Sequence, residues 1–232
     1  MDITGKTALV TGANRGLGRH LARELRDRGA TVYAGARNPA SVSLDGVIPI
    51  ALDVTDPASV AAAAAVASNV AILVNNAGSS TGASLLTGDL ADVRLELDTH
   101  FFGTLAVTRA FAPQLGAQGG SAVLNVLSVL SWISFPASGA YCAAKSAEWS
   151  LTNALRQELA PQGTRVSALH VGYMDTDMAR KVTAPKSDPA DIAKIAIDGL
   201  AAGDAEIVAD DVSRQVLAGL SSGVAGLYPQ LA

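Results

Sequence analysis

The chain has 232 residues, a length that one α/β core accommodates, so we expect a single domain over residues 1–232. Hydrophobic residues make up 49% of it and charged residues only 16%, a composition that excludes an intrinsically disordered chain. The net charge of -4, without a local cluster of lysine and arginine, argues against nucleic-acid binding.

Short apolar runs alternate with helical segments along the whole chain. We expect strands over residues 7–10, 30–36, 47–52, 70–74, 122–126, 165–170 and 206–209. We expect helices from the glycine-rich turn to about residue 28, from residue 56 onward, and over residues 89–115, 140–159 and 189–201. This alternation predicts an α/β fold: a single-domain, Rossmann-type, doubly wound parallel sheet of about seven strands with helices on both faces. Such a fold binds its ligand at the carboxyl ends of the strands.

The cysteine content and the hydropathy of the chain indicate the cellular compartment in which the protein works. Cys142 is the only cysteine, so the chain has no internal disulfide and no multi-cysteine metal site, and we expect no metal. Residues 1–6 carry no apolar signal core, and no uncharged run of about 18 apolar residues predicts a membrane span. We therefore expect a soluble cytoplasmic protein that does not act at a membrane.

Three glycines follow the first expected strand, within the segment Thr11–Gly18. Gly12 allows a tight turn, Gly16 lets the backbone approach a pyrophosphate, and Gly18 lets the next helix pack close to the strand. The unpaired N–H groups at the start of that helix then face the phosphates. Three glycines alone can be turn chemistry, but their position between a strand and a helix predicts dinucleotide binding.

The end of the second expected strand lacks the acidic residue that would bind the ribose hydroxyls of NAD. It reads Ala34-Gly35-Ala36-Arg37, and Arg15 in the glycine-rich turn supplies a second guanidinium that could reach a 2′-phosphate. Either arginine alone could be a solvated surface charge. Together, in the two loops that flank the ribose, they predict NADP(H) in preference to NAD(H).

The order of the motifs resembles the short-chain dehydrogenase/reductase family over nearly the whole chain. The family's glycine turn, Thr-Gly-x-x-x-Gly-x-Gly, matches Thr11–Gly18, its Asn-Asn-Ala-Gly matches Asn75–Gly78, and its Tyr-x-x-x-Lys matches Tyr141–Lys145. Ser128 stands where the family places its catalytic serine, and Asp53 where it places the aspartate that binds the adenine amino group. The resemblance also implies that Lys145 binds the nicotinamide ribose. A homodimer or homotetramer, formed through the helices that begin near residues 89 and 140, is implied as well.

The chemistry of Tyr141 and Lys145 follows from their spacing, because residues four apart project from one face of a helix. A phenol with a pKa of about 10 is a poor acid at neutral pH, and a neighbouring ammonium should lower this pKa toward the working range. We expect Tyr141 to protonate the substrate oxygen while hydride arrives from the nicotinamide, and Ser128 to hold that oxygen by a hydrogen bond. Taken alone, the pair could be a core tyrosine and a surface lysine.

The motifs described above supply the expected contacts to the cofactor. They come from Gly12, Asn14, Arg15, Gly16, Leu17, Gly18, Arg37, Asp53, Val54, Asn76, Ala77, Gly78, Tyr141, Lys145, Gly172, Met174 and Thr176.

Two positions depart from the family pattern. His100 stands where many members have an asparagine that anchors a water of the proton relay. A histidine could hold the same water, since it accepts, donates and titrates near neutrality, or it could be a structural residue, and both interpretations stay open. Val171 replaces the usual proline before Gly172, while Thr176 is kept. The backbone contacts can survive, because the proline contributes stiffness rather than a donor.

Only about a dozen residues separate Thr176 from the helix expected at Pro189, so we expect a short lid and an open active site. The candidate substrate-pocket residues are Leu130, Trp132, Phe135, Tyr173, Met174 and Met178. Their apolar character favours an apolar carbonyl or alcohol substrate, although exposed loop hydrophobes could serve subunit contacts instead. Cys142, next to Tyr141, is expected to be a small core residue.

These features predict an enzyme: an NADP(H)-dependent carbonyl reductase or alcohol dehydrogenase of the EC 1.1.1 type. The first alternative is a nucleotide-binding sensor or regulatory protein without turnover, which the departures at His100 and Val171 would fit. The intact Ser128, Tyr141 and Lys145 argue against it, because a sensor needs no acid–base helix. The second alternative, an epimerase or dehydratase, would need a larger substrate domain after the last strand.

Overall fold

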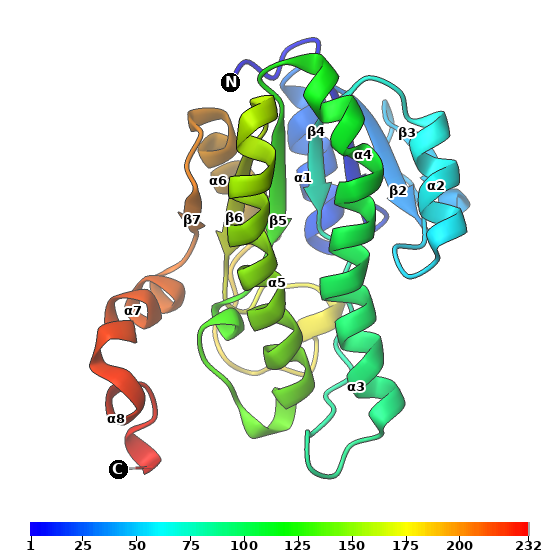
Figure 1. Ribbon diagram of the computed structural model, residues 1–232. Coiled ribbons are helices and arrows are strands. Elements are labelled where there is room, and N and C mark those ends of the chain that lie inside the picture. Colours follow the sequence, from blue (N-terminus) through cyan, green and yellow to red (C-terminus); the bar gives the residue numbers. More distant parts are fainter. Residues whose placement is uncertain (232) are drawn as a thin grey trace.

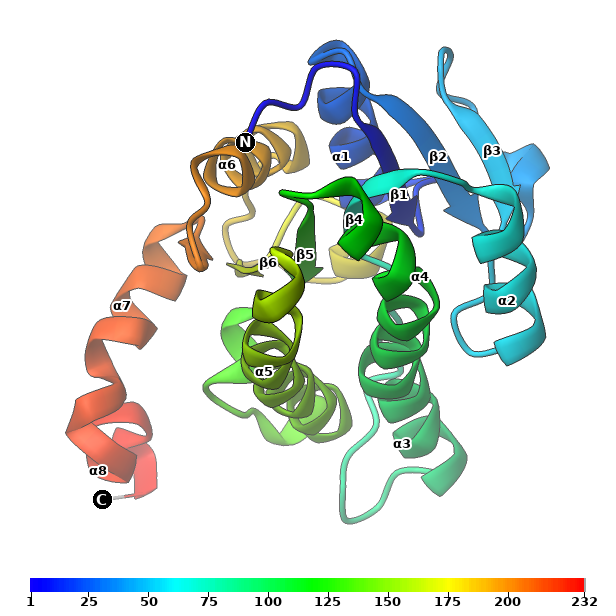
Figure 2. The ribbon, with the colours of Figure 1, turned by 45° about the horizontal axis from the view of Figure 1, so that its top comes forward.

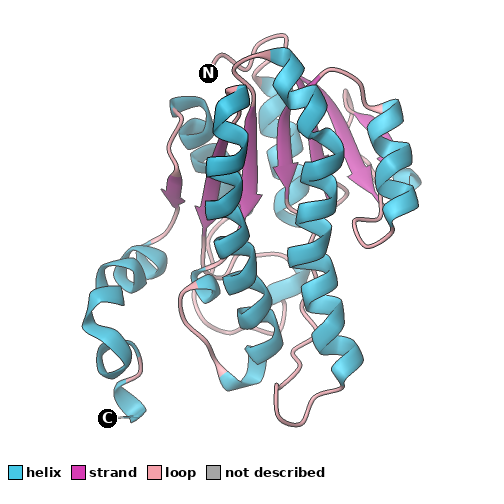
Figure 3. Ribbon diagram, viewed as in Figure 1, coloured by secondary structure: helices cyan, strands magenta, loops and turns pink. Residues whose placement is uncertain are grey.

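The computed structural model describes residues 1–231 and contains one sheet of seven strands with helices on both faces (Figure 1). The strand order is β3-β2-β1-β4-β5-β6-β7, so the order reverses between β1 and β4. Each neighbouring pair is parallel, and all carboxyl ends therefore lie at one edge of the sheet (Figure 3). The predicted doubly wound α/β fold is confirmed.

The strands lie close to their predicted positions. They are β1 (Thr7–Thr11), β2 (Thr31–Ala36), β3 (Ile48–Ala51), β4 (Val70–Asn75), β5 (Ala122–Val126), β6 (Arg165–His170) and β7 (Glu206–Val208). All residues of β4 and β5 are buried, which is typical of central strands covered by helices on both faces.

Two layers of helices enclose the sheet (Figure 2). One face is covered by α1 (Gly16–Asp27) and α6 (Pro189–Ala202), which bury Leu21, Leu25 and Ile197 against the strands. The other face is covered by α2 (Pro57–Val66), α4 (Thr104–Gln118) and α5 (Gly139–Leu159), whose apolar side chains form a second core around Phe111 and Leu155. In this way both surfaces of the sheet are removed from water.

The helix expected over residues 89–115 is interrupted. Its first part is α3 (Leu90–Leu97), which extends beyond the carboxyl edge of the sheet (Figure 1). A π-helical turn, Asp98–Gly103, joins α3 to α4 and contains His100. Single π-helical turns are rare and often occur at functional sites. The sequence does not reveal this turn, because the helical pattern continues on both sides of it.

Two further helices, which were not predicted, follow β7. They are α7 (Asp211–Gly219) and α8 (Gly223–Leu227), and they lie to one side of the sheet (Figures 1 and 2). The hydroxyl of Tyr228, just after α8, accepts a hydrogen bond of 2.8 Å from the backbone N–H of Ser134. The end of the chain therefore contacts the loop that precedes α5. Among residues 1–231, no helix is both long enough and apolar enough to cross a membrane.

Candidate active site

The glycine-rich turn brings the end of β1 to the start of α1. Gly12 and Gly16 have φ angles of +64° and +53°, in the left-handed region that favours glycine. A Cβ on Gly18 would lie 2.3 Å from the carbonyl oxygen of Gly12, so only glycine lets α1 begin this close to the turn. The first turn of α1 carries no acidic residue and no side-chain cap, which leaves its N–H groups for an anion.

Thr11 ties the ends of β1 and β4 together. Its hydroxyl accepts hydrogen bonds of 2.9 Å from the backbone N–H groups of both Asn76 and Ala77. The Asn76 side chain donates in return to the carbonyl of Thr11, also at 2.9 Å. The glycine-rich turn and the segment after β4 therefore form one surface, at the point where the strand order reverses.

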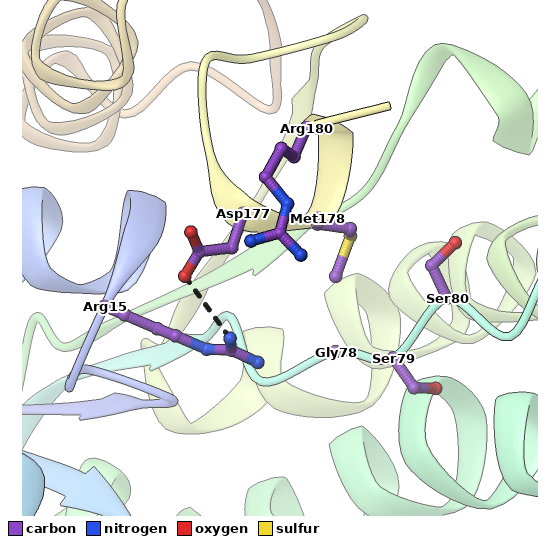
Figure 4. A pocket seen from close by; sticks show the side chains of 7 residues that line it. All are labelled: Arg15, Gly78, Ser79, Ser80, Asp177, Met178 and Arg180. Carbon is purple, nitrogen blue, oxygen red and sulfur yellow. Dashed lines mark hydrogen bonds and ion pairs between the residues drawn. The ribbon is translucent and has the colours of Figure 1, made fainter. Parts of the chain in front are cut away.

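A cavity of about 380 Å³ opens at this edge of the sheet (Figure 4). Its lining comes from the glycine-rich turn, from the loop after β4 and from the loop after β6: Arg15, Gly78, Ser79, Ser80, Asp177, Met178 and Arg180. The guanidinium groups of Arg15 and Arg180 both point toward Asp177. Charged and polar groups dominate the lining, in contrast to the apolar set predicted from the sequence.

The two arginines expected at the adenosine ribose, Arg15 and Arg37, have different surroundings in the structure. Arg15 pairs with Asp177, with 3.4 Å between Nη1 and Oδ2, across the mouth of the cavity (Figure 4). The neighbouring Asn14 reaches the loop after β2 instead, where Nδ2 donates to the hydroxyl of Ser41 at 3.1 Å. Arg37 stands exposed at the end of β2, as predicted from its position. The side chain from the glycine-rich turn that contacts the loop after β2 is therefore Asn14, whereas Arg15 pairs with Asp177.

The remaining residues expected to bind a cofactor also lie at the carboxyl edge of the sheet. Asp53 follows β3, and its Oδ1 accepts from the N–H and the hydroxyl of Thr55 at 3.0 and 2.7 Å. Val54 is buried against Gly103. Thr176, in the loop after β6, faces Gly16, since a Cβ added to Gly16 would lie 3.5 Å from the methyl carbon of Thr176. The glycine-rich turn and the loop after β6 thus converge.

The loop after β6 begins with the departures noted in the sequence. The carbonyl of Val171 accepts a hydrogen bond of 3.0 Å from the N–H of Val129, which extends the pairing of β5 and β6 beyond their ends. Gly172 donates its N–H to Asp210, and Met174 pairs with Ser187 in an isolated bridge. The loop is therefore held at both ends without the usual proline.

Ser128, Tyr141 and Lys145 are brought together, as their spacing predicts. Ser128 follows β5, and Tyr141 lies in the first turn of α5, where the Ser128 hydroxyl lies close enough to the phenol to lower its pKa. The Nζ atom of Lys145 lies 5.9 Å from the centre of the Tyr141 ring. A phenol, a hydroxyl and an ammonium thus share one site at the carboxyl edge of the sheet.

The pKa of Tyr141 differs in direction from the sequence-based expectation. Burial raises this pKa above its ordinary value of 10.0; Lys145 and Ser128 oppose the shift, while Glu148 adds to it. Lys145 lowers this pKa, as expected, but desolvation and a nearby carboxylate outweigh the ammonium, so the net shift is upward. Tyr141 is a neutral phenol at physiological pH.

Lys145 is held by two acceptors in the core, with only 4% of the residue exposed. Nζ donates to the carbonyl of Val126 at 2.7 Å and to Oε2 of Glu148 at 2.6 Å. Burial lowers the pKa of Lys145, but Glu148 and Tyr141 outweigh it, so the pKa is raised and the ammonium persists.

Glu148 was missed in the sequence. It is 1% exposed, and its Oε1 accepts a hydrogen bond of 2.8 Å from the hydroxyl of Thr104 in α4. The spacing rule that joined Tyr141 to Lys145 also joins Lys145 to Glu148, three residues further along the same helix face. That signal was present in the sequence and could have identified Glu148.

His100 occupies the space between Tyr141, Glu148 and a second buried glutamate, Glu96. Its ring lies edge-on to Tyr141, with 5.2 Å between ring centres. Nε2 lies 2.9 Å from the carbonyl of Ser79 and 3.3 Å from Oε2 of Glu96. Nδ1 lies 3.9 Å from Oε2 of Glu148 and has no hydrogen-bond partner within residues 1–231. His100 is therefore anchored through one ring nitrogen only.

Glu96 is fully buried and strongly favours its charged form. Burial raises its pKa, but hydrogen bonds from His100, from the N–H of Thr81 and from the hydroxyl of Ser79 outweigh this and hold the pKa at about 2. Nothing in the sequence pattern indicates this carboxylate, because its partners lie in a loop and in the π-helical turn.

The residues predicted for a substrate pocket divide into two groups. Phe135, Tyr173 and Met178 are exposed, and of these Met178 lines the cavity. Leu130 is buried in a small cluster with Cys142, which is the core residue expected. One face of Trp132 is covered by the ring of His170, which stacks on it with 3.8 Å between centres. Leu130 and Trp132, which form the second group, thus pack within the protein.

Comparison with known proteins identifies relatives of this chain. The family model described as short chain dehydrogenase matches residues 6–187. The oxidoreductase UcpA of Escherichia coli K12 is 35% identical over 202 residues, which cover 82% of this chain and 76% of UcpA.

Two solved structures are similar over most of their length. A short chain dehydrogenase from Burkholderia cenocepacia in complex with NADP has a TM-score of 0.95 and 36% identity, covering 100% of this chain and 99% of that one. A 3-ketoacyl-(acyl-carrier-protein) reductase from Brucella melitensis complexed with NADH has a TM-score of 0.79 and 28% identity, covering 85% and 91%. Together with the match over residues 6–187, these likenesses show that the chain belongs to the short-chain dehydrogenase/reductase family of oxidoreductases.

Proposed function

We propose that the protein is an NADP(H)-dependent oxidoreductase of the EC 1.1.1 type, which transfers a hydride between the nicotinamide and a small carbonyl or alcohol substrate. One observation carries the proposal: the hydroxyls of Ser128 and Tyr141 lie beside the buried ammonium of Lys145 at the carboxyl edge of the sheet. An acid, a hydrogen-bond donor and a fixed positive charge are what protonation of a carbonyl oxygen requires.

The residues at this edge fit a dinucleotide. The left-handed φ angles of Gly12 and Gly16 and the bare backbone at Gly18 form a cradle that a Cβ would fill. In this proposal the turn Gly12–Gly18 holds the phosphates and Asp53 with Val54 the adenine. The nicotinamide end lies among Asn76, Ala77, Gly78, Tyr141, Lys145, Gly172, Met174 and Thr176. When bound, the cofactor supplies the hydride.

Tyr141 then acts as the proton donor during reduction. Its raised pKa keeps the phenol protonated across the physiological range, as a donor requires. Ser128 holds the substrate oxygen through its hydroxyl. Lys145 stays an ammonium and stabilises the phenolate that remains once the proton has left. His100 is a positioning residue in this arrangement rather than a group that touches the substrate.

The preference for NADP(H) over NAD(H) rests on Arg37, which stands exposed at the end of β2 where an acidic residue would repel a 2′-phosphate. The relative from B. cenocepacia, crystallised with NADP, supports this choice. The reductase from B. melitensis was crystallised with NADH, so the wider group uses both nucleotides. The ratio of the dissociation constants of NADPH and NADH would decide which nucleotide this chain prefers.

A homo-oligomer is part of the proposal. The helices α4 and α5 lie side by side on the outer face of the sheet (Figure 1), and they correspond to the pair that the family resemblance assigns to the subunit interface. Light scattering of the purified protein would give the number of subunits, and a mass equal to one chain would remove this part of the proposal.

The test is a turnover assay with NADPH and a panel of ketones, aldehydes and quinones, followed by the loss of NADPH absorbance. We expect turnover of at least one compound, and a decrease of kcat by about 10²- to 10⁴-fold in Tyr141→Phe with little change in the Kd of NADPH. Tyr33→Phe, in β2, is the matched control. Full turnover by Tyr141→Phe would overturn the assignment, and tight NADPH binding without turnover of any compound would point to a nucleotide sensor.

A further inference from the structure

We propose that Glu148 is a positioning residue of this site: with His100 it fixes the ammonium of Lys145 and keeps Tyr141 in its protonated form. The consequence for catalysis rests on the proposed function, in which Tyr141 is the proton donor. The electrostatic relationship among these side chains does not depend on it.

The first step is the contact between Glu148 and Lys145. The two charged atoms are 2.6 Å apart, and the two side chains are 2% and 6% exposed, so water screens this pair little. The second carboxylate oxygen of Glu148 is held by the hydroxyl of Thr104, from a different helix. With Val126 as its other acceptor, the ammonium has two of its three N–H groups engaged. Glu148 therefore decides where this positive charge lies.

The second step is the position of His100. The carbonyl of Ser79 at 2.9 Å and the carboxylate of Glu96 at 3.3 Å favour a proton on Nε2, and the backbone N–H of Ser79 lies 3.3 Å from the same nitrogen. In that tautomer Nδ1 is an acceptor, as is the Glu148 carboxylate 3.9 Å away, so the two lie in contact without a direct hydrogen bond. The ring is confined, since a Cβ on Gly78 would lie 2.8 Å from its Cε1. His100 thus lies against the carboxylate side of the Lys145–Glu148 pair.

The third step is the sum of charges around the phenol. From α5 it is faced by the Lys145 ammonium and the Glu148 carboxylate, from α3 by the Glu96 carboxylate, and from the π-helical turn by His100. Behind these groups, the hydroxyl of Thr104 in α4 holds Glu148, and the carbonyl of Val126 in β5 holds Lys145. Two carboxylates therefore oppose one ammonium, which disfavours a phenolate at Tyr141. Glu148 supplies the negative charge that directly offsets Lys145.

This arrangement gives a defined direction for each variant. Replacing Glu148 by glutamine removes one of the two negative charges and leaves Lys145 free to stabilise the phenolate, so the midpoint of Tyr141 titration falls. Glu148→Asp keeps the charge but withdraws it by one methylene, so it should give an intermediate midpoint. A purely structural glutamate would alter stability in these variants without moving the midpoint.

The experiment is an ultraviolet titration of tyrosinate in the free protein, which needs neither cofactor nor substrate. The chain has four tyrosines, and subtraction of the Tyr141→Phe curve, made in each background, isolates Tyr141. We expect its midpoint to fall by about one pH unit in Glu148→Gln. Glu158→Gln, an exposed glutamate on the same helix, is the matched control and should leave the midpoint unchanged. Circular dichroism establishes which variants are folded.

An unchanged Tyr141 midpoint in both Glu148→Gln and Glu148→Asp would overturn the proposal; if Glu148→Gln does not fold, the intermediate shift of Glu148→Asp decides alone. In turnover assays, the alkaline limb of kcat for reduction should move to lower pH by the same amount. His100→Asn and Glu148→Gln should each lower kcat by about tenfold and be non-additive when combined. Absence of turnover in the unmodified protein would remove the proposed function and leave the titration result standing.

Discussion

The Nε2 atom of His170 lies 2.7 Å from Oε2 of Glu206, which joins the end of β6 to the edge strand β7. The other ring nitrogen, Nδ1, lies 3.2 Å from the hydroxyl of Ser131, and that hydroxyl donates to the carbonyl of Ser128. His170 is fully buried, whereas the Glu206 side chain is 35% exposed. A continuous line of contacts therefore links the edge of the sheet to the backbone of the serine that we assign to catalysis.

We expect Glu206→Gln to lower the free energy of unfolding at neutral pH by about 1 kcal/mol, because the pair is partly exposed and screened. Burial raises the pKa of Glu206, but His170 and Arg156 outweigh it, so the pKa is lowered. Because this pKa is lowered, the ionised carboxylate stabilises the folded state at pH values above its ordinary pKa. The stabilisation is lost as the pH falls through the pKa of the folded protein. Urea unfolding from neutral to acidic pH measures the effect; equal stability of Glu206→Gln and Glu158→Gln would contradict it.

Glu96 should make a larger and more sharply defined contribution. Its pKa is about 2 against an ordinary value of 4.5, so its stabilisation is present above pH 4.5 and is lost as pH falls toward 2. The difference corresponds to about 3 kcal/mol at neutral pH. We expect Glu96→Gln to unfold at lower urea concentration at neutral pH and to lack this acid-dependent component. Parallel curves for the two proteins between pH 4.5 and 2 would refute the assignment.

Arg37 and Arg15 should differ in their effect on nucleotide affinity. Arg37→Ala should raise the Kd of NADPH by about tenfold and leave that of NADH unchanged, because only the 2′-phosphate distinguishes the two. Arg15→Ala should have a smaller effect on this ratio, since Arg15 is engaged by Asp177. Calorimetric titration measures both constants, with Arg109→Ala on the exposed side of α4 as control. Equal losses of affinity for NADPH and NADH in Arg37→Ala would show that Arg37 does not contact the 2′-phosphate.

Gly18→Ala tests the approach of α1 to the glycine-rich turn. The new Cβ would meet the Gly12 carbonyl oxygen and Asn76 Nδ2, each at 2.3 Å, so the helix must shift. We expect a loss of about 1–3 kcal/mol in stability and weaker binding of NADPH. Gly219→Ala, where the nearest atom would be 3.6 Å away, should change neither. Unaltered NADPH affinity in Gly18→Ala would show that the turn does not hold the nucleotide.

Features that depend on neighbouring residues were predictable from the sequence. The buried strands follow from short apolar runs, and the glycine-rich turn from glycines at positions that need a positive φ. Ser128, Tyr141 and Lys145 were found through motif spacing, and helix geometry explains why the last two face one ligand.

Features that depend on contacts between distant segments were not predictable in the same way. Arg15 and Asp177 are separated by 162 residues, and no local pattern joins them. The π-helical turn leaves the helical pattern intact, and Glu96 reads as one more charge on an exposed helix. The direction of the Tyr141 pKa was misjudged because a spacing rule counts Lys145 but not the burial of the whole site. Helices α7 and α8 bury few residues, and the amphipathic pattern of α7 was not recognised in the sequence.

The π-helical turn before α4 accommodates one more residue per turn than an α-helix does, and each residue of an α-helix advances the side-chain direction by about 100°. The side chains of α3 are therefore rotated by a fixed angle from the directions that they would have in one continuous α-helix with α4. The phase of α4 directs Phe111 and Leu115 into the core beneath the sheet, while that of α3 directs a charged glutamate inward, past the ends of the strands. The two helices joined by this turn thus carry a hydrophobic anchor under the sheet and, beyond the ends of the strands, a buried carboxylate.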